Sequence, residues 1–281
     1  MDANVKKQLL LDAVNIRKGI IEGTFNAKSG HPGGSLSIAD VLAYLYRCEL
    51  NVDASAPKAE NRDRLVLSKG HAAPALYAAL ANAGFFPVED LKTLRKSNSY
   101  LQGHPNMNYV PGVDMSTGSL GQGISAACGM ALGAKLSGAK YRVYTILGDG
   151  EIQEGQVWEA AMYAAAKGLD NLVAVIDNNN LQIDGTVSSV NSPYPIPEKF
   201  KSFGWNVIEI CGDNFDEIDA AFNAAKSFVG KPTAIIAKTT KGKGVSFMED
   251  SCDWHGVAPN QEQYEAAVAE LDDELAKLEQ M

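Results

Sequence analysis

Four histidines are the residues of this sequence whose type and setting most clearly suggest chemistry. Each has a glycine as its neighbour, and the four are His31, His71, His104 and His255. Glycine allows a loop to approach a ligand closely, and imidazole exchanges protons near neutral pH. For one histidine, a satisfied polar side chain in a turn is the simpler interpretation. Four in the same setting favour anion contacts and proton transfer, and the alternative of a zinc site lacks a close ligand pair such as H-x-x-x-H.

An aspartate and an asparagine follow two successive expected strands. Asp149 lies in a Gly-Asp-Gly turn after the apolar segment 141–147, and Asn179 follows the next apolar segment, 171–177. A helix expected over 154–166 makes the two strands a βαβ unit, so both side chains should meet at the carboxyl edge of the sheet. Carboxylate and amide oxygens suit Mg²⁺ or Ca²⁺, and Mg²⁺ usually completes its shell with phosphate oxygens and water. The turn glycines and the following helix N-terminus would receive those phosphates.

The elements that must position these residues alternate along the chain. Apolar residues at helical spacing predict a long amphipathic helix over 5–27, followed by a glycine-rich loop over 29–34. Further helices are expected from about 37 and over 73–83, 88–96, 120–137, 215–228 and 261–279, and further strands over 64–67, 205–211 and 233–238. This alternation predicts an α/β fold in which a parallel sheet carries helices on both faces. We expect one domain, 1–281.

Composition and charge exclude several classes of protein. The chain has 25 Lys and Arg against 34 Asp and Glu, a formal net charge of −9, so neither nucleic acid nor an anionic membrane is an expected partner. No apolar run approaches the ~18 residues of a membrane span, and the N-terminus lacks the apolar segment of a secretory signal. The four dispersed cysteines are expected to be free and mostly buried, in a cytoplasmic protein.

Several motifs, in order along the chain, resemble those of transketolase. The Gly-Asp-Gly turn at Asp149 with Asn179 is similar to the thiamine diphosphate–magnesium motif of thiamine-dependent enzymes. The other matching segments are Ser29-Gly30-His31-Pro32-Gly33, Ser68-Lys69-Gly70-His71, Gln102-Gly103-His104-Pro105, Thr117-Gly118-Ser119-Leu120-Gly121-Gln122-Gly123 and His255-Gly256. The match spans essentially the whole chain but only the N-terminal, diphosphate-binding part of full-length members. It implies the thiamin diphosphate-binding fold, with thiamine diphosphate and Mg²⁺ (or Ca²⁺) as cofactors.

The resemblance also implies roles for individual residues. The metal ligands would be Asp149, the side chain of Asn179 and the carbonyl of Leu181. The residues against the cofactor would be His71, Gly118, Leu120, Gly150, Asn179 and His255. The residues lining the channel for sugar hydroxyls would be His31, His71, His104 and His255. All four histidines would thus serve catalysis.

Three further positions are compared with the family pattern. Glu154 matches a carboxylate in the network that joins two active sites across the subunit interface, which is compatible with an ordinary first-turn glutamate favoured by the helix dipole. Ser119 stands where proline is common in the family, a small departure. Lys241 stands where an apolar residue often contacts the cofactor, so it would either add a cation beside the diphosphate or remain solvated, as lysines usually do.

The resemblance implies a transferase that moves a two-carbon ketol unit from a ketose phosphate to an aldose phosphate, as in the pentose phosphate pathway. In the family, a glutamate of a pyrimidine-binding domain activates the cofactor, and that domain follows this one in the same chain. Here the sequence stops at Met281. We therefore expect the N-terminal subunit of a split transketolase, with a second chain carrying the pyrimidine-binding and C-terminal domains, in a heterotetramer of two of each.

Other functions stay open on the sequence alone. Within thiamine enzymes the alternatives are a split transketolase for an unusual sugar phosphate, a deoxyxylulose-phosphate synthase and the α chain of a 2-oxo acid dehydrogenase. The His31 and His104 segments favour a polyhydroxylated sugar over the last two. A dinucleotide-dependent oxidoreductase would use the glycines of 121–126, but no strand is expected before them. A module that only binds the cofactor would not need the channel histidines.

Overall fold

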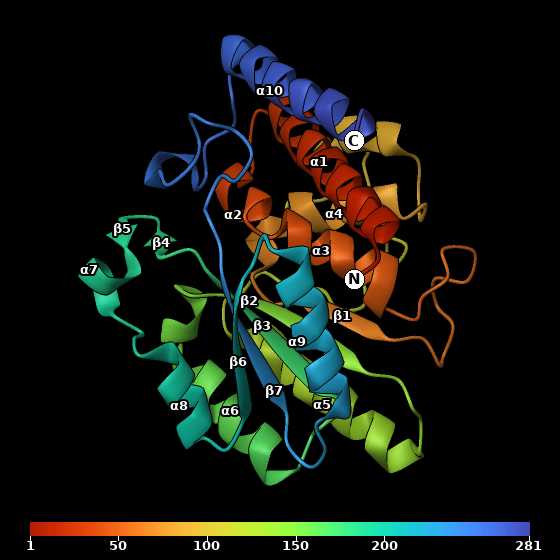
Figure 1. Cartoon of the computed structure of the whole chain (residues 1–281), viewed down its shortest axis with the longest axis vertical. Helices are drawn as coiled ribbons and strands as arrows, with labels where there is room; N and C mark the ends of the chain where they lie inside the picture. Colours follow the sequence, from red (N-terminus) through yellow and green to blue (C-terminus); the bar gives the residue numbers. More distant parts are fainter.

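A five-stranded parallel sheet forms the centre of the molecule. The computed structural model describes residues 1–281 and orders the strands β1-β2-β3-β7-β6 (Figure 1). Their bounds are β1 (Arg64–Leu67), β2 (Val143–Gly148), β3 (Leu172–Asn178), β6 (Asn206–Cys211) and β7 (Thr233–Lys238). Each neighbouring pair is parallel, as the alternation of strands and helices predicts.

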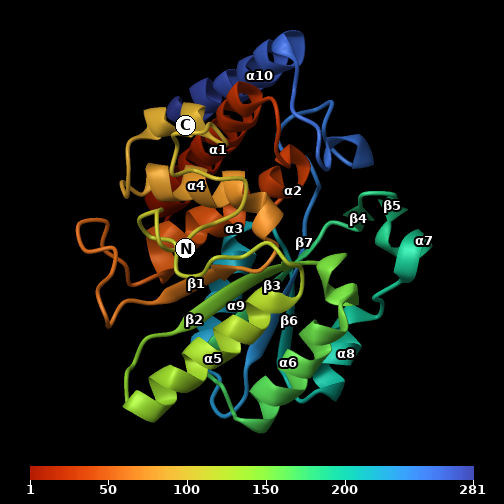
Figure 2. The same cartoon turned by 180° about the vertical axis from the view of Figure 1, so that it is seen from behind.

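Helices cover both faces of this sheet, which confirms the expected fold class. Figure 2 shows α5 (Gln122–Ser137), α6 (Gly155–Ala166) and α8 (Ile196–Ser202) over one face. Figure 1 shows α9 (Phe215–Ser227) over the other. The long helices α1 (Ala3–Ala27), α4 (Ala73–Asn82) and α10 (Gln261–Glu279) gather beyond the sheet together with the short α3 (Ala39–Tyr44).

The sequences of the strands are continuous apolar runs because both faces of the sheet are buried. Along β2, Tyr144 and Ile146 belong to the apolar core on one face, while Val143 and Leu147 belong to the core on the other. A half-exposed strand would show alternation of apolar and polar residues, whereas a covered parallel strand does not. None of the helices combines the length and apolarity needed to cross a bilayer.

The observed bounds differ from the predicted elements in a few places. A short helix, α2 (Pro32–Leu36), begins inside the expected glycine-rich loop, because Pro32 stands at a first-turn position that proline favours. The segment expected as a helix over 88–96 is a 3₁₀ helix, Val88–Thr93. Four small elements that follow β3 were not predicted: β4 (Leu181–Gln182), β5 (Gly185–Thr186), α7 (Val187–Asn191) and α8. They are too short to show a periodic pattern.

The prediction that the cysteines are mostly buried is wrong, although all four are free as expected. Cys128 is buried, Cys48 and Cys211 are exposed, and Cys252 is intermediate. Cys128 lies on the face of α5 that packs on the sheet, whereas Cys211 ends the edge strand β6. Position in the fold therefore decides exposure more than the apolar character of the thiol.

The carboxyl ends of three neighbouring strands meet at one edge of the sheet. Gly148 pairs with Asp177, and Asn178 pairs with Lys238, so β2, β3 and β7 end at the same level. The segments that leave this edge carry the motifs found in the sequence. The predicted convergence of Asp149 and Asn179 is confirmed, because each follows one of these strands.

Candidate active site

A cavity lies at this carboxyl edge and gathers nearly all the predicted site residues. Its volume of about 350 Å³ is in the range of small-molecule sites. The predicted residues that line it are His31, His71, Gly118, Leu120, Asp149, Gly150, Glu154, Asn179, Leu181 and His255. His104 is outside this lining, but its ring lies within 3.2 Å of the position where a Cβ on Gly118 would stand. It therefore lies directly behind the cavity wall.

Three of the histidines form a compact cluster. The ring centroids of His31 and His71 are 5.1 Å apart, those of His71 and His255 5.3 Å, and those of His31 and His255 5.4 Å. They come from the segment before α2, the segment after β1 and the segment before α10. The three glycine-containing loops therefore bring their histidines together. Histidines that stood in unrelated surface turns would not cluster in this way.

Burial keeps these imidazoles neutral at physiological pH. It lowers the pKa of His31 to about 4, with a further contribution from Arg95. Burial and then Lys241 lower the pKa of His255 to about 3, and burial places the pKa of His71 well below its usual value. A neutral imidazole offers one donor and one acceptor nitrogen, which suits hydrogen bonds with sugar hydroxyls; the low pKa values argue against the proton transfer that the sequence suggested. The positive charges of the cavity come from elsewhere.

Two buried lysines supply those charges. Lys241 is 1% exposed, so the interpretation as a solvated lysine is wrong. Its Nζ lies 2.9 Å from Nδ1 of His255 and donates to the carbonyl of Leu181 at 3.3 Å. Burial, followed by the charge of Lys69, lowers the pKa of Lys241 to about 8. Lys69 is similarly buried and donates to the carbonyl of Gly34 at 2.6 Å. In this motif the sequence predicted a role for His71 but none for Lys69.

Asp149 faces the cavity from the turn after β2. Its Oδ1 accepts from the amide of Gly150 at 2.9 Å, and its Oδ2 accepts from Nδ2 of Asn178 at 3.0 Å and from the amide of Asn180 at 2.5 Å. Burial, followed by the nearby Asp177, raises the pKa of Asp149 to about 6. The carboxylate has no cationic partner among its contacts. A divalent ion would relieve this unfavourable burial of negative charge.

The oxygen atoms beside Asp149 fit a hard cation. Asn179 and Leu181 line the same cavity, and the three residues have among their atoms a carboxylate, an amide oxygen and a backbone carbonyl. These are the ligands that Mg²⁺ and Ca²⁺ take in proteins, with phosphate and water in the remaining positions. The residues present therefore fit the metal that the sequence predicts.

Two glutamates after β2 have different environments. Glu151 is buried and accepts from Oγ of Ser68 at 2.5 Å and from the amides of Gly121 and Gly148 at 2.9 and 3.0 Å. It joins three cavity-forming segments, and no sequence motif marked it. Glu154 is exposed, precedes α6 and makes no side-chain capping contact. Glu154 is thus an accessible residue of the cavity lining, whereas Glu151 is enclosed.

The segment before α5 is inconsistent with the alternative of a dinucleotide-dependent oxidoreductase. Residues 121–126 open α5, but the preceding 110–116 form turns and bends and no strand. A dinucleotide-binding glycine motif requires a strand directly before its helix. The glycines here serve close packing instead, because a Cβ on Gly123 would lie 2.5 Å from the Cα of Ser68.

Comparison with known proteins gives consistent matches over nearly the whole chain. The family model for the transketolase thiamine diphosphate binding domain matches residues 10–274. The chain is 49% identical over 261 residues to the 6-deoxy-6-sulfo-D-fructose transketolase subunit SqwG of Clostridium sp. (strain MSTE9), covering 93% of this chain and 95% of that protein. It is 44% identical over 271 residues to an apulose-4-phosphate transketolase subunit of Phocaeicola vulgatus, covering 96% of each.

The fold is also that of solved transketolases. The crystal structure of transketolase from Campylobacter jejuni matches with a TM-score of 0.86 at 32% identity, covering 100% of this chain. This chain spans only 48% of that protein. It therefore has the length of the named subunits and about half the length of the solved enzyme.

Proposed function

The chain belongs to the transketolase family, and we propose that it is the diphosphate-binding subunit of a two-chain transketolase. One observation carries this proposal: all the motifs but the one at His104 line one cavity, in a chain that has the length of the relatives named as subunits. Such an enzyme is a transferase that moves a two-carbon ketol unit from a ketose phosphate to an aldose phosphate. We infer that residues 1–281 form one domain and that the protein works in the cytoplasm.

The cavity residues divide between metal and cofactor in this proposal. Asp149, Asn179 and Leu181 would hold Mg²⁺ (or Ca²⁺) through their oxygen atoms. His71, Gly118, Leu120, Gly150, Asn179 and His255 would contact thiamine diphosphate. Lys241 would add a positive charge beside the diphosphate, as its burial at the cavity wall supports. When bound, thiamine diphosphate supplies the electron sink for breaking and making a carbon–carbon bond.

The histidines would handle the sugar. His31, His71 and His255 are neutral and close together, so each can donate one hydrogen bond and accept another at a hydroxyl. We place His104 at the outer part of this channel, behind Gly118.

The partner would complete the site. We propose a second chain with the pyrimidine-binding and C-terminal domains, in a heterotetramer of two of each, with Glu154 in the network that crosses the interface. The names of two relatives favour an unusual sugar substrate: one relative is named for 6-deoxy-6-sulfo-D-fructose and the other for apulose-4-phosphate. A split transketolase for an unusual sugar phosphate is therefore the second candidate, and a role in the pentose phosphate pathway depends on which substrate is used.

Native mass spectrometry of the complex, followed by a ketol-transfer assay, tests the proposal. The chain purified from its own cells should carry an equal number of a second polypeptide, with thiamine diphosphate and Mg²⁺ retained, and only the complex should transfer the ketol unit. Lys241→Met should lose retained cofactor by about tenfold or more, as expected for one charge-assisted contact. The exposed Lys238→Met is the matched control and should retain it. Enzyme-like turnover by the isolated chain would refute the two-chain proposal.

A further inference from the structure

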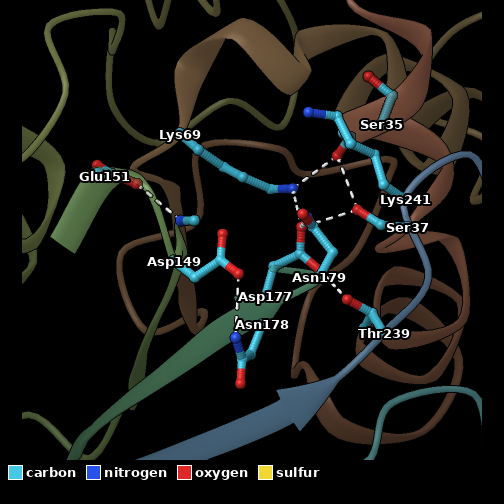
Figure 3. Close-up of polar contacts among 12 residues, drawn as sticks. Ser35, Ser37, Lys69, Asp149, Glu151, Asp177, Asn178, Asn179, Thr239 and Lys241 are labelled. Carbon is cyan, nitrogen blue, oxygen red and sulfur yellow. Dashed lines mark hydrogen bonds and ion pairs between the residues drawn. The ribbon is translucent and has the colours of Figure 1, made fainter. Parts of the chain in front are cut away.

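Asp177, near the end of β3, accepts more hydrogen bonds than any ligand candidate at this edge of the sheet. Its side chain is fully buried. Oδ2 accepts from Oγ of Ser37 at 2.7 Å, from Nζ of Lys69 at 2.6 Å and from Nδ2 of Asn179 at 2.8 Å (Figure 3). Oδ1 accepts from Oγ1 of Thr239. The Asp177 carboxylate therefore holds four neighbouring side chains, three of them through Oδ2 alone.

This contact decides which end of the Asn179 amide faces the metal site. An ionised carboxylate accepts hydrogen bonds and cannot donate them, so the amide atom beside Asp177 must be the NH₂ nitrogen. The amide oxygen then lies on the other side, where the backbone amide of Leu181 donates to it at 3.0 Å. An sp² oxygen keeps a second lone pair, and the residue lines the cavity with Asp149.

The two aspartates of this edge are therefore in opposite electrostatic situations. Asp177 is paired with the ammonium group of Lys69, and both of its oxygens accept from neighbouring side chains. Asp149 receives only uncharged donors and faces the cavity. The first aspartate is suited to holding neighbouring groups in place, and the second is suited to receiving a cation.

We propose that Asp177 is a positioning residue that orients the Asn179 amide so that its oxygen, and not its nitrogen, faces the divalent ion. This inference rests on the proposed function in one respect, namely that Asn179 is a ligand of that ion. Partners that orient the ligands of a metal typically contribute about 10- to 100-fold to metal affinity.

The test measures Mn²⁺ binding to the two-chain complex with thiamine diphosphate, by electron paramagnetic resonance of the free ion. Asp177→Ala removes the acceptor and should weaken Mn²⁺ binding by about 10- to 100-fold. Thr239→Val is the matched control, because it removes a donor from the other carboxylate oxygen and leaves the contact with Asn179. The control should bind Mn²⁺ within about threefold of the wild type, well short of the loss expected for a ligand-orienting contact.

A double-mutant cycle separates positioning from a general structural effect. If Asp177 acts through Asn179, then Asp177→Ala should cost little further affinity once Asn179→Ala has removed the amide. Asp177→Asn should recover much of the lost affinity, because its single oxygen can still accept from Asn179 while its NH₂ group faces Oγ1 of Thr239. Equal losses for Asp177→Ala in both backgrounds, or wild-type Mn²⁺ affinity in Asp177→Ala, would overturn the proposal.

Two further measurements keep the outcomes distinct. If Asp177→Ala does not fold, as judged by circular dichroism, Asp177→Ser replaces it in the double-mutant cycle. The serine hydroxyl is polar, but its side chain is one bond shorter than that of aspartate and does not reach Asn179. A wild-type complex that binds no Mn²⁺ in the presence of thiamine diphosphate would overturn the metal site of the proposed function itself. A wild type that binds Mn²⁺ with additive losses in the cycle would overturn only the role of Asp177.

Discussion

At the scale of single residues, the cavity combines neutral imidazoles with buried lysines. His31 shows how strongly the fold opposes a charge on the ring: its Nδ1 is buried and has no hydrogen-bond partner, so a second proton would find no acceptor. Burial and the charge of Arg95 lower its pKa to about 4. Stability at acidic pH is lost as a consequence, because the unfolded chain binds a proton that the folded chain excludes.

We expect the contribution of His31 to the free energy of unfolding to fall as pH decreases from about 6.5 to about 4, by at most about 1.4 kcal/mol per pH unit. The sign follows from the lowered pKa, since the unfolded chain holds more protons in this window. His31→Asn should show a shallower slope in urea unfolding of the chain at pH 7, 6 and 5. Above pH 7.5 the two proteins should differ by a constant amount, and parallel curves throughout would contradict the assignment.

At the scale of elements, α5 meets the segment after β1 without any intervening side chain. A Cβ on Gly123 would lie 2.5 Å from the Cα of Ser68, and that segment carries Lys69 and His71 into the cavity. Gly129, further along the same helix, has nothing within 4 Å of its Cβ position. The two glycines therefore serve different purposes within one helix.

Gly123→Ala should destabilise the isolated chain by about 1–3 kcal/mol, because the added methyl group forces α5 away from Ser68. Gly129→Ala is the matched control and should stabilise the chain by about 0.5–1 kcal/mol, since alanine restricts the unfolded state more than glycine and fits the helix. Urea unfolding of both variants measures the difference. The packing explanation is refuted if both substitutions change stability in the same direction.

At the scale of the whole molecule, α1 and α10 lie side by side and together support the segment after β7 (Figure 1). Nε of Arg17 on α1 donates to the carbonyl of Lys243 at 3.1 Å. Leu271 on α10 is fully buried, and its Cδ2 lies 3.7 Å from the Cβ position of Gly244. This segment also carries Lys241, so the two ends of the chain help to place a cavity residue.

Leu271→Ala should lower the free energy of unfolding by about 2–5 kcal/mol, the usual cost of a cavity in a packed core. Its neighbour provides the control: Asp272 pairs with Lys18 on the surface, and Asp272→Ala should cost no more than about 1 kcal/mol. Thermal or urea unfolding measures both. Equal effects would mean that α10 is held by surface charges and not by its buried face.

The sequence by itself determined the α/β fold, the strands and the convergence of Asp149 with Asn179. Continuous apolar runs and helical spacing carry that information locally, and parallel strands end at one edge for topological reasons. The grouping of the histidines was also predictable, since glycine loops and motif order marked them. The roles of those residues toward cofactor and metal stay predictions.

Only the tertiary structure decided the charges of the cavity. The burial of Lys241 and Lys69, and the hydrogen bonds that Asp177 accepts from Ser37, Lys69 and Thr239, depend on segments far apart in the chain that meet at the sheet edge. Local sequence patterns do not contain such contacts. From the sequence alone, lysine and aspartate are expected to be exposed to solvent. They form buried ion pairs only where the fold excludes water and brings opposite charges together.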